Sequence, residues 1–373
     1  MRALRILLAL GSVTFLCTTG ASAVDGVNEI NATSIIAAGG YPYTIPAPGS
    51  YVLTGDLAPP PGVGALVAGA PNVEIDLNGF TIVSPGAGGA VGIDSAGFAG
   101  LVVRRGVVAG FAGAAISAGP ESKVIETKLT GNGGGVAGGF TCLVVMNNIV
   151  SNTGDGVQTN HCKVENNIIE FNSGSGITGL GNVIVHNRIG SNFGGGILAF
   201  GGNKIQENVI HMNSGFGIAD VVPPPPPPPV PSPPGPPPRN NIIGNVIDNT
   251  FGGPGISLFM PALITDNSVT ANFSDGILCG ASCVVNGNVV DRNNISVTPG
   301  SGGVTVAAGS MVHANAISFN EGFGLLLPPT LDASYTNNTI SGNGTPLGAG
   351  PDVISPPTLT GAFGNNCSGV ACP

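Results

Sequence analysis

The densest charged group in the sequence consists of five side chains that could together carry out acid–base chemistry. They are Asp76, Arg104, Arg105, Glu126 and Lys128. Proton removal from a sugar carbon requires a base at that carbon and a cation beside the substrate carboxylate. We expect Arg104 and Glu126 at equivalent positions on successive repeats. The alternative, which we favour, is a solvated ladder of opposite charges worth about 0–1 kcal/mol.

The histidines offer a second kind of chemistry, because imidazole titrates near neutral pH and binds metals. They fall at four different positions of the repeat described below and form no column: His161, His186, His211 and His313. We therefore predict no shared metal site and no cofactor. Asp155, His161 and Lys163 are another acid–base candidate, but they fall on different parts of one turn, so we interpret them as ordinary surface residues.

The cysteines indicate disulfides. Six follow the first 23 residues: Cys142, Cys162, Cys279, Cys283, Cys367 and Cys372. An even number in an exported chain favours pairing, and the absence of Cys-x-x-Cys disfavours zinc. Cys142 and Cys162 each lie five residues before the first Asn of their repeat, which places them about 4.8 Å apart on adjacent coils. We predict that bond, together with the local pairs Cys279–Cys283 and Cys367–Cys372.

A repeat of about twenty residues sets the elements that position these side chains. It reads Asn-x-aliphatic-x-x-Asn and then Gly, as in Asn167 to Asn172 followed by Gly176. β-Branched residues three before and two after the first Asn predict two short strands, and an aliphatic residue after the Gly predicts a third. Three strands and three bends per repeat predict an all-β, right-handed parallel β-helix solenoid of about twelve coils of roughly 20–27 residues.

The two Asn positions of each repeat fall between apolar strand residues, where the chain must bend. Asn tolerates the left-handed conformation that a tight bend needs, and stacked Asn amides form ladders. We expect Ile169, Ile189 and Ile210 to stack inward in one column, with Asn residues at the bend beside them.

The segments at both ends differ from the repeat. Residues 1–23 resemble a signal peptide, because Arg2 and Arg5 precede a short apolar run and Ala21-Ser22-Ala23 resembles a cleavage site. We predict an N-terminal cap at 24–62, the β-helix at 63–343 and a C-terminal cap at 344–373. No later segment has the length and apolarity of a membrane span. These features predict a secreted, periplasmic or extracellular protein.

One segment, residues 223–238, is nearly all proline and interrupts the repeat. Proline cannot donate to a strand ladder, so we expect a loop excluded from the stack. The favoured interpretation is a tolerated loop expansion. The alternative is a ligand for an aromatic groove on a partner protein.

Composition limits the partners. The net charge is −9 and only 8% of residues are charged, which is unfavourable for nucleic-acid binding. The chain has no Trp and four Tyr, which counts against efficient binding of sugar rings. We expect the phenylalanines of the repeats to fill the core or the bends. They are Phe171, Phe193, Phe216, Phe273, Phe319 and Phe323.

Two segments carry a resemblance to a known group of proteins. Residues 49–57 (GSYVLTGDL) and 73–82 (VEIDLNGFTI) resemble exported bacterial proteins of the right-handed parallel β-helix, pectin-lyase-like superfamily. The Asn and Gly-Ile repeats between 135 and 343 are similar to its repeat regions. The resemblance implies this fold and a superfamily that includes pectate lyases, polygalacturonases, alginate lyases and epimerases, and phage tailspikes. The Gly-His-Gly and Asp-Pro-His motifs of enzymatic members are absent here.

Three functions follow from these observations. The favoured one is a non-catalytic extracellular or envelope surface protein or scaffold, because catalytic motifs are absent and ionisable residues are few. The second is a polysaccharide lyase, hydrolase or epimerase acting on an acidic glycan, which an acid–base pair across several coils would favour. The third is a glycan- or partner-binding module, which an exposed aromatic row would favour. The expected partner is a polysaccharide or another envelope protein.

Overall fold

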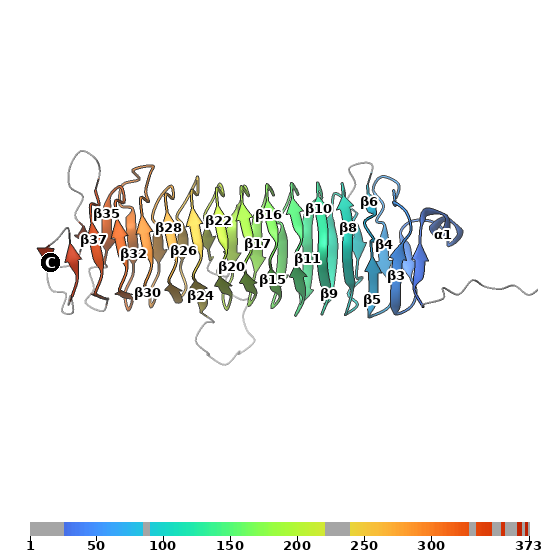
Figure 1. The fold of residues 1–373 in the computed structure, drawn as a ribbon, viewed down its shortest axis with the longest axis horizontal. Coiled ribbons are helices and arrows are strands. Elements are labelled where there is room, and N and C mark those ends of the chain that lie inside the picture. Colours follow the sequence, from blue (N-terminus) through green and yellow to red (C-terminus); the bar gives the residue numbers. More distant parts are fainter. Residues whose placement is uncertain are drawn as a thin grey trace, which may run out of the picture.

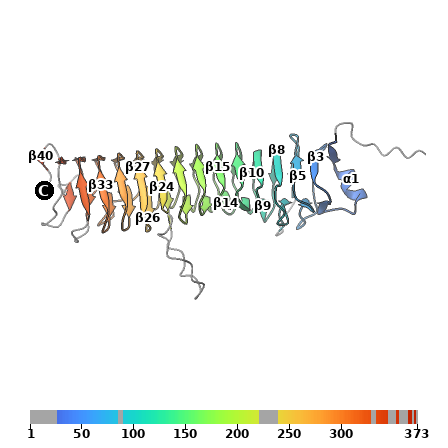
Figure 2. The ribbon, with the colours of Figure 1, turned by 90° about the horizontal axis from the view of Figure 1, so that it is seen from below.

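The protein is a long rod of stacked β-strand coils, seen from two sides in Figures 1 and 2. The computed structural model describes residues 26–84, 90–220, 239–327, 333–344, 352–354, 364–367 and 370–371. These residues contain a single short helix, α1 (Ala32–Ala37), at the N-terminal end of the rod. The predicted signal peptide, 1–23, and the proline-rich segment, 223–238, lie outside the described residues.

One parallel sheet contributes one strand to each coil, and its 14 strands give about 14 coils. The expectation of about twelve coils is therefore close. We refer to it as the single-strand sheet; its members are β2 (Tyr43–Ile45), β4 (Leu66–Ala68), β7 (Ile93–Asp94), β9 (Ala114–Pro120), β11 (Gly134–Phe140), β14 (Val157–Asn160), β17 (Ser175–Gly179), β20 (Gly195–Ala199), β23 (Ile218–Ala219), β26 (Ile256–Leu258), β29 (Ile277–Cys279), β32 (Gly302–Val306), β35 (Phe323–Leu326) and β38 (Val353–Ile354).

The other sheet has 26 strands, because most coils contribute two strands separated by a bend. We refer to it as the double-strand sheet. All its pairings are parallel except β39–β40. Its members are β1 (Asn28–Ile30), β3 (Gly49–Leu53), β5 (Val73–Asp76), β6 (Thr81–Val83), β8 (Val102–Ala109), β10 (Lys123–Thr130), β12 (Leu143–Val145), β13 (Asn148–Val150), β15 (Lys163–Glu165), β16 (Ile168–Glu170), β18 (Val183–Val185), β19 (Arg188–Gly190), β21 (Lys204–Gln206), β22 (Val209–His211), β24 (Asn240–Ile243), β25 (Val246–Asp248), β27 (Ala262–Thr265), β28 (Ser268–Thr270), β30 (Val284–Asn286), β31 (Val289–Asp291), β33 (Met311–His313), β34 (Ala316–Ser318), β36 (Ser334–Thr336), β37 (Thr339–Ser341), β39 (Asn366–Cys367) and β40 (Val370–Ala371).

The core consists of stacked aliphatic columns, one side chain from each coil. Ile169 pairs with Ile189, and Ile189 pairs with Ile210, along β16, β19 and β22. All three side chains are completely buried. The predicted inward column is confirmed, because period-2 alternation in short strands places every second residue inside.

The Asn residues form buried ladders beside these columns. The backbone N–H and Nδ2 of Asn167 both donate to Oδ1 of Asn187, at 3.0 and 2.9 Å. Nδ2 also donates to the carbonyl of Val144, on the preceding coil. Each amide thus joins three coils and satisfies backbone groups that the bend leaves unpaired.

The expectation that these Asn residues adopt the left-handed conformation is wrong. The left-handed residue is the one before each Asn, as with His186 (φ 55°) before Asn187 and Phe171 (φ 58°) before Asn172. That residue turns the chain, so the Asn that follows points into the coil and hydrogen-bonds there. The sequence pattern located the bend, but it placed the turning residue one position too late.

The stack extends beyond the predicted boundary at residue 63. β1 pairs with β3, and β2 pairs with β4, so residues within the expected N-terminal cap, 24–62, contribute strands to both sheets. The ladder also continues across the proline-rich segment, because Lys204 of β21 pairs with Asn241 of β24. Of the expected C-terminal cap, 344–373, the described residues include β38, β39 and β40.

Two of the predicted disulfides are present. Cys142 and Cys162 bridge adjacent coils with a Cα–Cα distance of 4.5 Å, and Cys279 pairs with Cys283. Cys367 is disulfide-bonded, and Cys372, its predicted partner, lies outside the described residues. Within the described part of the chain, no helix is long and apolar enough to cross a membrane.

Candidate functional site

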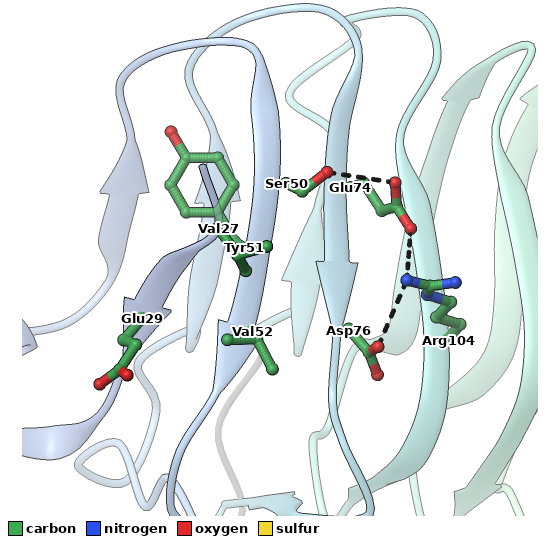
Figure 3. Close-up of a pocket in the computed structure, with 8 residues that line it drawn as sticks. All are labelled: Val27, Glu29, Ser50, Tyr51, Val52, Glu74, Asp76 and Arg104. Carbon is green, nitrogen blue, oxygen red and sulfur yellow. Dashed lines mark hydrogen bonds and ion pairs between the residues drawn. The ribbon is translucent and has the colours of Figure 1, made fainter. Parts of the chain in front are cut away.

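The predicted charged group lies on β5, β8 and β10 of the double-strand sheet, near the N-terminal end. Figure 3 shows two of its members, Asp76 and Arg104. β5 and β8 pair in a register that places Asp76 beside Arg104. Arg104 Nη2 lies 2.8 Å from Glu74 Oε1 and 3.4 Å from Asp76 Oδ2. One guanidinium therefore pairs with two carboxylates on the neighbouring strand.

Arg105 closes this group from the bend that follows Arg104. It has φ 59°, and its side chain is half-exposed and folds back onto the buried Asp76. Arg105 Nε donates to Asp76 Oδ1 at 3.1 Å, and Nη2 contacts the other carboxylate oxygen. The backbone N–H of Asn78 also donates to Oδ1, at 2.9 Å. Asp76 is thus saturated by donors.

These donors decide the protonation state of Asp76. Its burial alone would raise the carboxyl pKa, but hydrogen bonds from Arg105 and Asn78 and the charges of both arginines lower the pKa below its ordinary value. Reciprocally, Asp76 raises the pKa of Arg105. The pair is ionised at neutral pH, so Asp76 is a very weak base.

Glu126 and Lys128 do not complete an acid–base site here. The expectation that Arg104 and Glu126 are equivalent is wrong, because β8 and β10 align Arg104 with Ile125 and Gly106 with Thr127. Arg105 and Glu126 are the equivalent pair, and both occupy the left-handed bend position. Glu126 and Lys128 are exposed, and neither forms an ion pair with a described residue.

A shallow cavity of about 370 Å³ adjoins this group. Figure 3 shows its lining on the first coils: Val27, Glu29, Ser50, Tyr51, Val52, Glu74, Asp76 and Arg104. Ser50 Oγ lies 3.4 Å from Glu74 Oε2. Three of its eight lining residues are acidic, and the only cation, Arg104, is already paired with two of them. The cavity therefore offers little to an anionic ligand.

A second charged cluster, which the sequence analysis missed, lies at the middle of the rod. It joins Glu170 of β16, Arg188 of β19 and His211 of β22. Arg188 Nε lies 3.0 Å from Glu170 Oε1 and 3.2 Å from His211 Nε2, and His211 Nε2 lies 3.5 Å from Glu170 Oε1. Glu170 and His211 are mostly buried, whereas Arg188 is 56% exposed. An acid–base pair and an accessible cation therefore converge across three coils.

Gly190 makes this convergence possible. It separates Glu170 from His211 in the same outward column, and a Cβ at Gly190 would lie 2.5 Å from the His211 ring. The next residue in the column is Asp248, whose buried Oδ1 has no hydrogen-bond partner among the described residues. The sequence signal was a shared position, three residues after the first Asn, in Glu170, Gly190 and His211.

The other candidates remain separate. Asp155 Oδ1 accepts from the backbone N–H of Ser175, the His161 ring packs on Phe140, and Lys163 pairs with Glu165. His186 contacts Glu207, and His313 contacts Thr336. Across the described ranges, no three His, Cys, Asp or Glu side chains converge as metal ligands.

The repeat phenylalanines lie mainly at bends. Phe171, Phe193, Phe273 and Phe319 have exposed rings, Phe216 is half-buried, and Phe323 is buried. Phe251, which the sequence analysis did not single out, is also exposed. An exposed aromatic row therefore exists even though Trp is absent and Tyr is scarce.

Comparison with known proteins identifies the fold. No protein-family model matches the sequence, and no curated protein matches it. The A-module of the Azotobacter vinelandii mannuronan C-5 epimerase AlgE4 has a TM-score of 0.54 at 14% identity, covering 90% of this chain and 93% of that chain. The AlgE6 A-module of the same organism has a TM-score of 0.52 at the same identity and coverage. The fold is thus a parallel β-helix, as the resemblance implied.

Proposed function

We propose that this protein is an exported, non-catalytic β-helix that serves as a rigid extracellular or envelope scaffold. The observation that carries the proposal is the pairing of Asp76 with both Arg104 and Arg105. The buried carboxylate of Asp76 is saturated, and Arg104 and Arg105 are both occupied by it. These three side chains support a stable outer wall, and the paired Asp76 does not serve as a base for proton abstraction.

A turnover screen tests this proposal. The purified protein is incubated with pectin, alginate and other uronans, and with neutral polysaccharides, and unsaturated products, reducing ends and epimerised sugars are measured. We expect no product from any polymer. If the wild type releases products and a folded Arg105→Ala variant does not, the non-catalytic proposal is overturned. The activity would then lie at the group that contains Asp76, Arg104 and Arg105.

A second candidate function rests on the Glu170–Arg188–His211 cluster. An enzyme acting on an acidic glycan needs a cation for the uronate carboxylate and a base for the adjacent carbon. Arg188 is the accessible cation, and its Nε currently donates to His211 Nε2. A substrate carboxylate that bound Arg188 would free Nε2 of His211 to accept a proton. The fold shared with two modules named as mannuronan C-5 epimerases supports this alternative.

Matched variants separate the two candidates. If the cluster is catalytic, His211→Asn should abolish turnover on a uronan, whereas His161→Asn should leave it unchanged, because His161 packs on Phe140 away from the cluster. Arg188→Ala should chiefly raise KM, since its role is to bind the carboxylate. Absence of turnover by the wild type, or equal turnover by His211→Asn, would remove this candidate.

A further inference from the structure

Seven exposed apolar side chains form one narrow strip along an edge of the rod. The apolar ridge consists of Phe171, Phe193, Met212, Phe251, Phe273, Ile295 and Phe319. Their exposed fractions range from 37% to 65%. Each comes from a different one of seven successive coils, so the ridge extends for roughly 29 Å at 4.8 Å per coil. Soluble proteins seldom leave such a contiguous strip uncovered without a binding role.

The backbone fixes the ridge on both sides of the second Asn ladder. Phe171, Met212 and Phe319 each lie directly before the second Asn of their repeat. They adopt the left-handed conformation themselves, with φ of 58°, 55° and 53°. Phe193 and Phe251 follow the ladder residue and donate backbone hydrogen bonds to Asn172 and Asn213 of the preceding coil. The rings therefore project from a backbone that is hydrogen-bonded on every coil.

This rigidity favours binding. The ladder of second Asn residues lies between the column that precedes it and the column that follows it, and it is buried. For example, Nδ2 of Asn172 donates to Oδ1 of Asn192 at 3.0 Å. A ligand that lies on the ridge therefore orders no loop and moves no strand. Preorganised surfaces lose less conformational entropy on binding than mobile ones.

The polar side chains along the ridge are small and uncharged over most of its length. Ser191 and Asn249 share the column of Phe171, and Ser214 shares the column of Phe193. Charge appears only at the C-terminal end, where Arg292 and Glu321 line a cavity of about 370 Å³ with Ile295 and Phe319. Hydroxyl and amide groups between rings suit a ligand with an apolar face and a hydroxylated edge.

The flanking outward column disfavours anionic ligands. It carries Glu170, Asp248 and Asp291 together with His211, and Arg188 is the cation paired with Glu170 beside it. The whole chain has a net charge of −9. An anionic polymer or an anionic lipid surface is therefore disfavoured, and nucleic acid is disfavoured for the same reason.

The shape of the ridge favours a linear polymer over a protein partner. A stable protein interface buries about 800 Å² on each partner over a broad patch, whereas this surface is only two side chains wide. A linear polymer matches a narrow strip that repeats along one axis. Sugar rings present an apolar C–H face to an aromatic ring and hydroxyls to its neighbours.

We propose that the apolar ridge binds a linear, uncharged polysaccharide laid along the axis of the rod. Phe193, Phe251 and Phe273 supply the central stacking surface, because they lie in one column. The ridge contains no residue of either charged cluster, and the proposal does not depend on whether the protein is catalytic.

A binding assay with ridge variants tests the proposal. The probes are insoluble cellulose, xylan and β-1,3-glucan, with pectin and alginate as anionic comparisons. The triple variant Phe193→Ser/Phe251→Ser/Phe273→Ser uses the residue that the repeat itself places in this column at Ser173 and Ser214. We expect wild-type retention on at least one neutral polymer, at low and at high salt, and at least a tenfold loss in the variant, which is about 1.4 kcal/mol.

The matched control is Phe259→Ser, which removes an equally exposed ring (58%) outside the ridge and should bind like the wild type. Far-UV circular dichroism and thermal unfolding establish that each variant is folded. If the triple variant does not fold, Phe193→Ser decides, because Ser173 and Ser214 occupy the same column.

Three results of the retention assay would overturn the proposal. They are no retention on any neutral polymer, unchanged binding by the folded ridge variant, and stronger retention on pectin or alginate than on neutral polymers. A wild-type dimer in size-exclusion chromatography that becomes monomeric in the ridge variant would also overturn it, because the ridge would then bind a second copy. None of these results bears on turnover, so they are distinguishable from failure of the scaffold proposal.

Discussion

Asn147 and Asn167 lie directly above one another, with the backbone N–H and Nδ2 of Asn147 donating to the same Oδ1 of Asn167 at 2.9 and 3.0 Å. Asn147 also accepts two hydrogen bonds from Thr127 and donates to the carbonyl of Val124. A single amide therefore holds three coils in register. Its neighbour Asn148 is exposed and takes no part in the ladder.

The adjacent pair provides a matched test of the ladder. Asn147→Ala should lower the free energy of unfolding by about 2–4 kcal/mol, because it leaves buried donors and acceptors on both neighbouring coils unpaired. Asn148→Ala should change it by less than about 0.5 kcal/mol. Urea denaturation of both variants measures the difference. Equal effects would mean that solvent replaces the ladder at no cost.

The aliphatic columns provide a second stability test. Ile189 is completely buried between Ile169 and Ile210, so Ile189→Ala should cost about 2–5 kcal/mol through lost contacts and a cavity. Val209→Ala removes methyl groups from a side chain that is 45% exposed and should be nearly neutral. Thermal unfolding compares the stability of the two variants. A small loss of stability in Ile189→Ala would show that neighbouring side chains move to fill the cavity.

The repeat period was sufficient to predict most of the fold, because every coil must place apolar residues at the same inward positions. Ile169, Ile189 and Ile210 had to be apolar, and Asn167 and Asn187 had to satisfy the bend, so both columns could be predicted. The turning residue could not be identified, because His186, Phe171 and Met212 all occupy the left-handed position and share no chemistry.

The candidate sites depended on relations that a single repeat does not contain. A shift of one residue in the register between β8 and β10 decides whether Arg104 or Arg105 aligns with Glu126. The middle cluster requires that His211 reach Glu170 across a coil in which Gly190 provides the space. Such contacts across two coils become visible only when side chains of neighbouring coils are placed together.

The disulfides should contribute unequally to stability. Cys142–Cys162 spans 20 residues of sequence, whereas Cys279–Cys283 spans four. Because cross-link stabilisation grows with the length of the closed loop, Cys142→Ala/Cys162→Ala should cost about 2–4 kcal/mol, and Cys279→Ala/Cys283→Ala should cost less. Chemical unfolding measures both variants. Non-reducing peptide mapping tests the predicted Cys367–Cys372 pair, and free thiols at all six positions would refute the scheme.

The first charged group predicts a loss of stability in acid. The pKa of Asp76 is lowered in the folded state, so its contribution to stability is present at neutral pH and is lost as the pH falls below about 4 through the folded-state value. Asp76→Asn should therefore be less stable than the wild type at pH 7. The difference should shrink in acid, which unfolding curves measured between pH 7 and pH 2 would show. A constant difference would mean that packing, and not the ion pairs, stabilises this position.

Asp275 predicts the opposite pH dependence. It is 6% exposed, and burial raises its carboxyl pKa, while hydrogen bonds from the Gly302 N–H (3.1 Å) and the Thr305 hydroxyl (2.9 Å) oppose the shift only in part. A raised folded-state pKa means that stability is greatest in acid and is lost as the pH rises through that value. Asp275→Asn keeps an acceptor for both donors and removes the buried charge, so it should be more stable than the wild type at pH 7, with the gain disappearing in acid. Asp155→Asn is the matched control, because Asp155 also precedes the Gly of its repeat and is only half-buried, and its gain should be smaller. If Asp275→Asn is less stable than the wild type at pH 7, the hydrogen bonds to the carboxylate outweigh the cost of burying its charge.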